Sequence, residues 1–312
     1  MSEPRQDRRL DTSLLRHLAK ANQRRVVLHA AGVLAVYAVA VVVAMQAGLG
    51  ATAVVASMVS GVVLAGFLNA AHDCVHRSHL RSKKANRIMG AVWSTPLLVN
   101  FSVYRYQHLV HHRYTGVEGD TEPDRTYPGL PAYLYALTGI SLWRHTFATI
   151  ARNCRGGYPA SINNEQRRAE AVADNRALCG WLLAALALTV VFPRELAFAY
   201  WLPLYFAGPA IIFLALPEHY GLWGSPDIAR NTRTVRSNPA TRFLLWNANY
   251  HAEHHRYPAV ATLNLHRLHR AMPEPHPIQE SSYLGFHVKL ARELGAKSPA
   301  GQEEPETQGS TS

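Results

Sequence analysis

Four long apolar runs constrain the fold of this chain more than any other feature of its sequence. They cover about residues 26–47, 51–71, 177–192 and 196–216. About 20 consecutive apolar residues cross the hydrocarbon core of a bilayer as one helix. The third run is short and needs flanking polar residues that reach the interface. We therefore predict four membrane-spanning helices. The alternative, buried core helices of a soluble protein, is strongest for the third run.

The charges predict how these helices are arranged. The first two runs are separated only by residues 48–50, which carry no charge, and the last two only by residues 193–195, with one Arg and one Glu. The formal net charge is +11, and nearly all Arg and Lys residues lie outside these two turns. Basic residues favour the cytosolic side of a membrane protein. We expect an all-α integral membrane protein with two hairpins, both termini in the cytosol, and a cytosolic helical cap.

The remaining segments complete the expected organisation. Residues 1–25 form a basic cytosolic segment without the features of a signal peptide. One membrane domain covers 26–290, and 291–312 is expected to be a disordered tail, since its end is rich in Gly, Ser, Pro, Glu and Gln. The apolar stretch 88–103 is predicted to lie at the interface or to re-enter the membrane edge. The aromatic-rich stretch 133–150 is predicted to be one interfacial helix.

Composition narrows the partners and the source. A basic chain can bind nucleic acid, an anionic membrane or an acidic protein, but no nucleic-acid motif is found, so no nucleic-acid partner is expected. The three cysteines show no pattern, so no disulfide framework is implied. Arg outnumbers Lys by 27 to 5, which is typical of GC-rich coding. We therefore expect a bacterial cytoplasmic membrane.

Histidines supply the chemical signal. The sequence contains one H-x-x-x-H box at 72–76 and two H-x-x-H-H boxes, at 108–112 and 251–255. Residues three and four apart share one face of a helix, and neutral imidazole is a common ligand of iron, zinc and copper. With a lone histidine after the fourth run, nine candidate ligands result, which is enough for two metal ions: His72, His76, His108, His111, His112, His219, His251, His254 and His255.

The placement of these boxes supports convergence. His72 and His219 lie at the predicted cytosolic ends of the second and fourth spans, and the other boxes lie in polar segments on the same side. All nine can therefore meet in one layer at the membrane surface. Among the other histidines, His79 is left open because it lies three residues after His76, and His266 and His269 are interpreted as a polar stripe on a helix. The rest are interpreted as surface or core residues: His17, His29, His145, His276 and His287.

Carboxylates and amides near the boxes are candidates for supporting roles. A metal-bound histidine usually donates its second N–H to a carboxylate or a carbonyl. Two asparagines before the third box are candidates for holding a metal-bound water, and Asn247 would share a helical face with His251. The full set of candidate supporting residues, each of which could instead be a solvated or capping residue, is Asp73, Asp120, Asp124, Glu218, Asn247, Asn249 and Glu253.

The three boxes, in this order and with four spans, resemble the membrane fatty acid desaturase superfamily, which includes related hydroxylases and ketolases. The resemblance rests on 72–76, on 108–112 followed by Arg-Tyr-Thr, and on 249–255 followed by Arg-Tyr-Pro, and it covers about residues 26–290. It implies a non-haem di-iron centre, O2 as co-substrate, and conversion of an acyl C–C single bond to a double bond. It also implies an extra ligand in the region of His219.

The electrons for such a reaction must come from another protein. The chain has no dinucleotide-binding or haem-attachment motif, so a ferredoxin or cytochrome-type donor with its reductase is expected, steered by the basic face. Three alternatives remain at this point. They are a hydroxylase or ketolase acting on a lipid, carotenoid or specialised metabolite, a haem b electron carrier, and a zinc-dependent membrane hydrolase.

Overall fold

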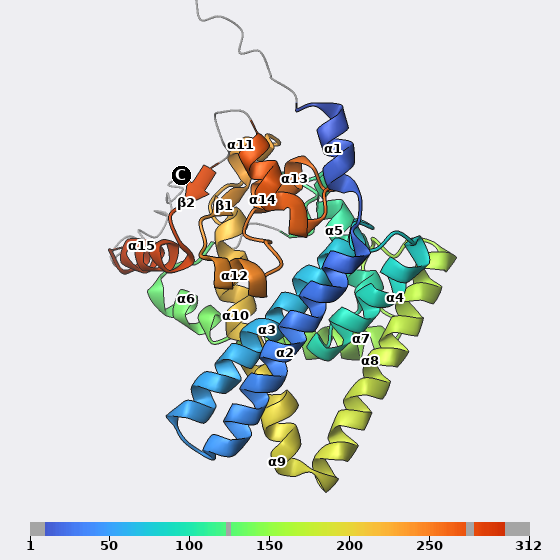
Figure 1. Ribbon diagram of the computed structural model, residues 1–312, viewed down its shortest axis with the longest axis vertical. Helices are drawn as coiled ribbons and strands as arrows, with labels where there is room; N and C mark the ends of the chain where they lie inside the picture. The colour runs from blue at the N-terminus through green and yellow to red at the C-terminus, as the bar shows by residue number, and fades with distance from the viewer. Residues whose placement is uncertain (1–9, 123–125, 273–277, 297–312) are drawn as a thin grey trace, which may run out of the picture.

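Four long apolar helices dominate the computed structural model, which describes residues 10–122, 126–272 and 278–296 (Figure 1). Helices α2 (Gln23–Ala47), α3 (Ala51–Val75) and α8 (Glu165–Val191) are each long and apolar enough to cross a membrane. The fourth candidate span, Pro193–His219, is built from α9 (Pro193–Leu196), the π-helical turn η2 (Ala197–Trp201) and α10 (Leu202–His219). The prediction of a mostly helical protein with four candidate spans is therefore confirmed.

The helices extend beyond the apolar runs on the side of the histidines. Helix α3 continues past the second run to Val75, which places His72 inside the helix. Helix α8 begins at Glu165, where the side chain of Asn164 accepts a hydrogen bond from the backbone N–H of Arg167. A helix ends where its capping groups are, not where the bilayer ends. The helices are therefore longer than the predicted membrane-spanning runs on this side.

Prolines shape the fourth span. Pro209 and Pro217 lie inside α10, and a proline cannot donate to the carbonyl four residues earlier. The two carbonyls left free belong to Tyr205 and Phe213. Trp143 Nε1–H donates to the first at 3.4 Å, and His287 Nε2 lies 2.7 Å from the second. Side chains from α7 (Ile140–Cys154) and α15 (Tyr283–Ala296) thus replace backbone hydrogen bonds and fasten α10 to the elements around it.

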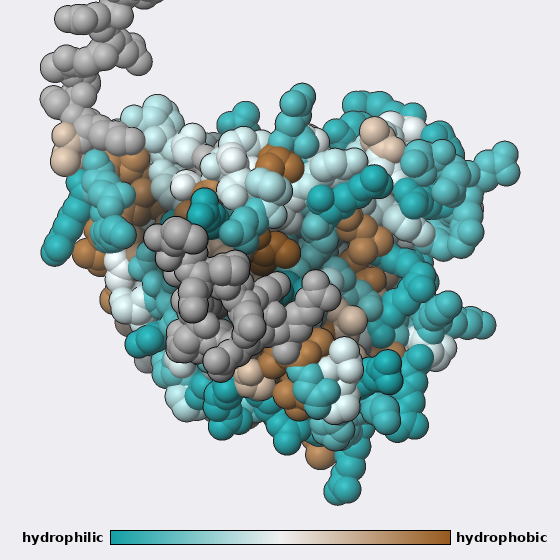
Figure 2. Space-filling view, turned by 90° about the horizontal axis from the view of Figure 1, so that it is seen from above, coloured by the Kyte–Doolittle hydropathy of each residue, from teal (hydrophilic) through white to brown (hydrophobic). Residues whose placement is uncertain are grey.

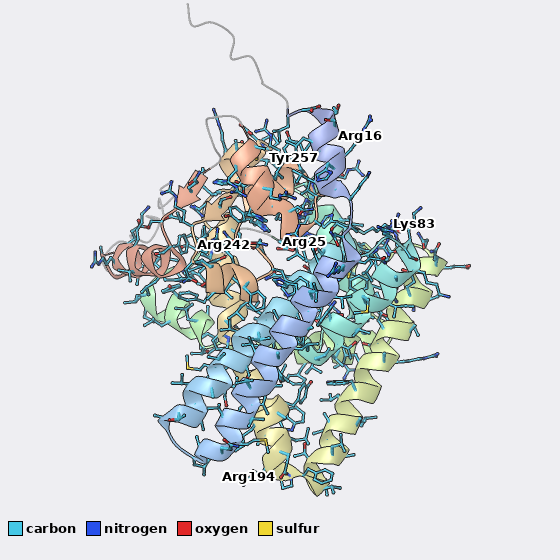
Figure 3. All side chains as sticks on the ribbon, in the orientation of Figure 1. Arg16, Arg25, Lys83, Arg194, Arg242 and Tyr257 are labelled. Carbon is cyan, nitrogen blue, oxygen red and sulfur yellow. The ribbon has the colours of Figure 1, made fainter. Side chains whose placement is uncertain are left out.

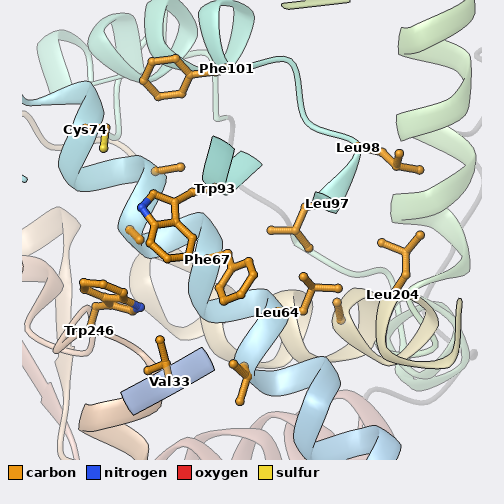
Figure 4. Packing of buried hydrophobic residues seen from close by; sticks show 14 of the residues in the cluster. Val33, Leu64, Phe67, Cys74, Trp93, Leu97, Leu98, Phe101, Leu204 and Trp246 are labelled. Carbon is orange, nitrogen blue, oxygen red and sulfur yellow. The ribbon is translucent and has the colours of Figure 1, made fainter. Parts of the chain in front are cut away.

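The largest core cluster packs α3 against α4, α5 and the turn before the third box (Figure 4). The rings of Phe67 and Trp93 lie 4.9 Å apart, and those of Trp93 and Trp246 lie 5.8 Å apart. Gly66 permits this close packing, because a Cβ there would lie 2.2 Å from the Leu244 carbonyl oxygen. The core therefore fixes the segment before His251 against the helix that carries His72.

The cap consists of the described residues of 76–164 and 220–296. It contains a two-stranded parallel sheet in which Thr234 pairs with Gln279. Helix α1 (Thr12–Ala19) packs against it from the N-terminal side. The cap elements are α4 (Lys83–Ser94), η1 (Thr95–Leu97), α5 (Phe101–Arg113), α6 (Leu130–Leu137), α7 (Ile140–Cys154), α11 (Ile228–Asn231), β1 (Arg233–Val235), α12 (Pro239–Leu244), α13 (His251–Arg256), α14 (Thr262–Ala271), β2 (Ile278–Glu280) and α15 (Tyr283–Ala296).

The structure describes three segments in more detail than their prediction did, and the membrane placement of 88–103 stays a prediction. Residues 133–150 form two helices, because Gly139 takes a φ of +73° and ends α6 before α7 begins. Residues 88–103 form the end of α4, the η1 turn and the start of α5, and Leu97, Leu98 and Phe101 are buried in the core. Helix α15 continues to Ala296, so the first six residues of the expected tail are helical. The rest of that tail lies outside the described residues.

Candidate metal centre

The nine histidines predicted from the sequence meet at one place. They come from the end of α3, from the residue that follows it, and from α5, α10 and α13. Asn100 begins α5 by accepting a hydrogen bond from the backbone N–H of Val103. The 13-residue helix that follows presents His108, His111 and His112 within one turn. Residues far apart in the sequence thus share one buried cluster.

The nine side chains divide into two neighbouring groups. The first, which we call group A, contains His72, His76, His108, His112 and His254, whose candidate ligand atoms all lie within 4.8 Å of one another. Group B contains His111, His219 and His255 on the same criterion. His251 joins group B, because its Nε2 lies 3.0 Å from the Nε2 atoms of both His219 and His255.

The nitrogen atoms are spaced as metal ligands would be. The Nε2 atoms of His72 and His112 each lie 2.8 Å from Nε2 of His108. Ligands at about 2.0–2.1 Å from one metal ion, at right angles, would be about 3 Å apart. The Nε2 atoms of His76 and His111 are buried without a hydrogen-bond partner, which is unusual for a polar atom. A metal ion in each group would satisfy these atoms.

Burial keeps most of these imidazoles neutral. It lowers the pKa of His108, His251, His254 and His255 well below the ordinary value, and neighbouring histidines add to the effect. The pKa of His112 falls to about 2 for the same reasons. Metal ions bind the neutral imidazole. The cluster is therefore held in the form that coordinates a metal.

His111 differs from the other box histidines outside the spans. Burial would lower its pKa, but a hydrogen bond to Asp120 and the charges of Glu122 and Asp120 outweigh this effect and raise it. Asp120 Oδ1 lies 2.6 Å from His111 Nδ1, and Oδ2 accepts from the backbone N–H of Gly116. This carboxylate fixes the ring so that Nε2 points into group B.

The family profile described as "Fatty acid desaturase" matches residues 49–286, which is most of the chain and includes all nine histidines. The chain belongs to this family. The omega-6 fatty acid desaturase of Brassica napus chloroplasts is 24% identical over 69% of this chain and 52% of its own length. The sn-1 oleoyl-lipid 12-desaturase of Picosynechococcus is 41% identical, but over only 18% of this chain and 16% of its own. The sn-1 oleoyl-lipid 12-desaturase of Anabaena variabilis is 34% identical over 20% of this chain and 17% of its own length.

The chain therefore spans about half of the plant relative and about a sixth of the cyanobacterial ones. Membership of the desaturase family, the four apolar helices and a histidine cluster able to hold metal confirm the general identification made from the boxes. Family membership and the four helices long and apolar enough to cross a membrane are thus consistent with each other.

Two further carboxylates approach the ligands of this desaturase-family cluster. Glu218 Oε1 lies 3.5 Å from Nδ1 of His251, and Glu122 Oε1 lies 3.5 Å from Nδ1 of His108. Glu218 was predicted from the sequence as a supporting residue, whereas Glu122 was not. The missed residue lies ten positions after the second box, and the only signal for it was its place in the same acidic loop as Asp120.

Glu253 supports the third box from behind. Its buried carboxylate lies 2.6 Å from Nδ1 of His269 and accepts a hydrogen bond from the hydroxyl of Thr234. It therefore connects α13 to α14 and β1, and its hydrogen bonds run to residues outside the cluster. His269 was interpreted as part of a polar stripe on a helix, whereas the structure shows that it anchors the helix that carries the third box.

Asp73 likewise connects elements of the structure through hydrogen bonds. It accepts hydrogen bonds from the N–H and the hydroxyl of Thr262 at the start of α14, and from the hydroxyl of Ser78. A carboxylate at a helix N-terminus satisfies free N–H groups. His79 lies 3.6 Å from Asp73 and accepts from Trp93 Nε1–H. Asp73 and His79 therefore join the first box to the core and to α14, outside both groups.

The two asparagines before the third box adopt different roles. Asn247 has a φ of +58° in the turn between α12 and α13, so the expected helical face shared with His251 does not exist. Asn249 donates from Nδ2 to the Val235 carbonyl, and its Oδ1 is buried without a partner. Asp124, the remaining predicted carboxylate, lies outside the described residues.

The histidines predicted to lie outside the site are outside both groups wherever they are described. His287 has both nitrogens bonded, with Nδ1 2.6 Å from the Tyr133 hydroxyl and Nε2 near the Phe213 carbonyl. His29 Nε2 lies 2.9 Å from the Phe243 carbonyl oxygen. His17 and His145 are exposed, and His266 is half-buried. His276 lies outside the described residues.

A cavity of about 330 Å³ adjoins the cluster, and we call it the histidine cavity. Its wall includes His72 and His108 of group A and His251 of group B. Apolar side chains from α3 and α10 line one part of it, and polar side chains line another. The principal lining residues are Ala65, Leu68, Tyr104, Glu122, Ile211 and Glu218. A small part of an apolar substrate can therefore lie directly against the candidate ligands.

Proposed function

We propose that this protein is an O2-dependent membrane fatty acid desaturase whose nine histidines hold two iron ions. The observation that carries the proposal is the pair of groups A and B, because nine converging imidazoles are too many for one ion. Group A would hold one iron, and group B with His251 the other. Zinc hydrolases need three or four ligands, which would leave half of this cluster without a role.

The bound di-iron centre would supply the oxidising power to activate O2 and to remove hydrogen from two adjacent aliphatic carbons. The overall reaction takes O2, two electrons and two protons, and it yields an alkene and two molecules of water. The protein itself positions the substrate. The histidine cavity holds an apolar chain against the ligands, and fixing a reacting carbon in this way supplies much of the rate enhancement.

The names of the relatives suggest the substrate class. Three cyanobacterial relatives are named sn-1 oleoyl-lipid 12-desaturases, and the plant relatives are omega-6 desaturases. We propose that this protein, too, acts on a fatty acyl group. The sequence identity to each relative is low or covers only a segment. Both an acyl lipid and an acyl-CoA are therefore candidate substrates, and the experiments compare them.

A hydroxylase or ketolase on the same scaffold is the second candidate. The polar part of the histidine cavity favours it, because Gln107, Thr121 and Glu122 could accommodate a polar product. The two reactions differ in mass. Desaturation removes two hydrogens from the substrate, whereas hydroxylation adds one oxygen, and mass spectrometry of the products therefore separates them.

The charges favour an orientation with both termini and the cap in the cytosol of a bacterial cell. Arg16, Arg25, Lys83 and Arg242 lie toward the end of the molecule that carries the cap, whereas Arg194 lies at the opposite end (Figure 3). Positive residues favour the cytosolic side. An acidic ferredoxin or cytochrome-type donor could then reach the cap. We propose that 26–290 acts as one domain in this arrangement.

Expression with a bacterial ferredoxin and its reductase, in a host that lacks polyunsaturated lipids, tests the proposal. We expect a new doubly unsaturated acyl chain by mass spectrometry and about two iron ions per chain by elemental analysis. His111→Ala should remove the product. His17→Ala, which changes an exposed histidine on α1, should leave it unchanged. One zinc ion without iron, or unchanged product in His111→Ala, would contradict the proposal.

A further inference from the structure

A second cavity shares a wall with the histidine cavity. It has a volume of about 590 Å³, and we call it the lateral groove. Leu214 of α10, Leu245 after α12 and Tyr283 at the start of α15 line both cavities. Each volume lies within the range of about 300–1,000 Å³ that is typical of ligand sites. These three side chains therefore form a wall that the groove shares with the site of the proposed reaction.

The lateral groove has an apolar end among the spans and a polar end at the cap. Met58 and Val62 of α3 and Phe206 and Ala210 of α10 line the apolar end. The side chain of Met58 is 48% exposed within a candidate span, so this end faces lipid. Arg236, Ser237, Asn238 and Ser282 line the other end. A molecule with an apolar chain and a polar head matches this division.

Arg236 supplies a positive charge at the polar end. It is exposed, and its side chain lies 3.1 Å from the amide oxygen of Gln279. None of the carboxylates in the described ranges lies within ion-pair distance of it, whereas its neighbour in the sheet, Arg233, lies 3.8 Å from Glu280. A guanidinium without a carboxylate partner favours an anionic ligand.

The shared wall consists of two leucine side chains and one aromatic ring, which comes from α15. Tyr283 is buried, with its ring 6.3 Å from that of Phe213. Its hydroxyl has no hydrogen-bond partner among the side chains and backbone that the structure describes. This ring is therefore not held in place by a hydrogen bond, and its rotation would connect the two cavities.

We propose that the substrate is an anionic glycerolipid that enters sideways from the bilayer through the apolar end of the lateral groove, which α3 and α10 line. One acyl chain lies in the lateral groove, the other passes between Leu214 and Tyr283 into the histidine cavity, and Arg236 contacts the head group. This inference rests on the proposed function, since only a reaction on acyl chains requires the second cavity. It favours a two-chain lipid over a single-chain thioester as the substrate.

Photolabelling tests this entry route without relying on turnover. The full-length protein, loaded with iron, is placed in phosphatidylcholine nanodiscs with phosphatidylglycerol that carries a diazirine on one acyl chain. We expect saturable labelling of α3 near Met58 and of α10 between Phe206 and Phe213, competed by unlabelled phosphatidylglycerol. Labelling that does not saturate, or that is spread evenly over all four spans, would overturn the inference.

Two variants connect the route to catalysis. Ala210→Trp fills the apolar end of the groove, and we expect it to remove both the labelling and the turnover of dioleoyl phosphatidylglycerol while retaining iron. Turnover of oleoyl-CoA should be much less affected. Arg236→Gln should raise KM for phosphatidylglycerol about fivefold with little change in kcat. The matched control Arg24→Gln replaces an exposed arginine that lines neither cavity and should leave KM unchanged.

The outcomes separate the two proposals. If oleoyl-CoA alone is converted, or Ala210→Trp with normal iron content converts the lipid at the wild-type rate, lateral entry is wrong while the desaturase proposal stands. If the iron-loaded wild type converts neither substrate, the proposed function fails. Lateral entry is then decided by photolabelling alone, where saturable labelling of the groove supports it and its absence overturns it.

Discussion

Asp120 is the residue whose support of the histidine cluster can be tested most directly. Its carboxylate bonds to His111, to the backbone N–H of Gly116 and to that of Glu122. Replacing a carboxylate behind a metal ligand typically lowers metal affinity about 10- to 100-fold. We expect Asp120→Asn to lose metal from group B first, because the amide has the same shape but no charge to hold the Nδ1 proton of His111.

Elemental analysis after dialysis against a graded chelator measures this effect. The matched control is Asp227→Asn, since Asp227 is an exposed residue that caps the four-residue helix α11. Equal iron retention in Asp120→Asn and wild type would mean that His111 does not depend on this carboxylate. Loss of iron in the control as well would indicate that the whole cap has loosened.

At the scale of elements, α10 depends on side chains from its neighbours. His287→Phe keeps an aromatic ring beside Phe213 but leaves the Phe213 carbonyl and the Tyr133 hydroxyl without their partner. An unsatisfied buried polar group costs about 1–3 kcal/mol. We expect a lower free energy of unfolding by about this amount, measured by chemical denaturation in detergent. Lys289→Gln, two residues along the same helix and exposed, should have little effect.

The same histidine gives a dependence on pH. Burial lowers the pKa of His287, although its hydrogen bond to the Phe213 carbonyl opposes the shift. A group whose pKa is lower in the folded state stabilises the fold above its unfolded pKa of about 6.5, and that stability is lost as the pH falls below it. The stability difference between wild type and His287→Phe should therefore shrink from about pH 8 to about pH 5. A constant difference would contradict this assignment.

The spacing of residues along the sequence predicted the helices and the candidate ligands. It predicted less well which side chains from different elements contact one another. The spacing of the histidines was sufficient to name nine residues that do converge, since a helix fixes which side chains share a face. The roles of Glu122 and His269 were not predictable, because each depends on an element distant in sequence or on the path of a loop. The break at Gly139 was missed because it follows from backbone conformation, while the residues around it keep a helical character.

At the scale of the whole molecule, charge and apolar surface are separated. The face of the cap seen from above is mostly hydrophilic, with scattered hydrophobic residues (Figure 2). Exposed apolar side chains are frequent on the spans instead, for example Val27 at 62% and Leu183 at 67% exposure. This division is what a protein with its cap in water and its helices in lipid requires. It also leaves the cap as the surface on which the proposed soluble electron donor would bind.

The electron donor should bind this cap through charge. Arg113, directly after the second box, and Arg267, on α14, are exposed, and basic residues on a surface speed its encounter with an acidic partner. Turnover with an acidic ferredoxin should therefore fall steeply as salt rises past about 0.1 M, where the Debye length is about 10 Å. The double variant Arg113→Gln and Arg267→Gln should flatten this dependence, whereas Arg292→Gln on α15 should not. A small uncharged chemical reductant should show no comparable salt effect. If ferredoxin-driven turnover does not change with salt, the donor does not dock by charge, and the basic residues would then act on the lipid surface alone.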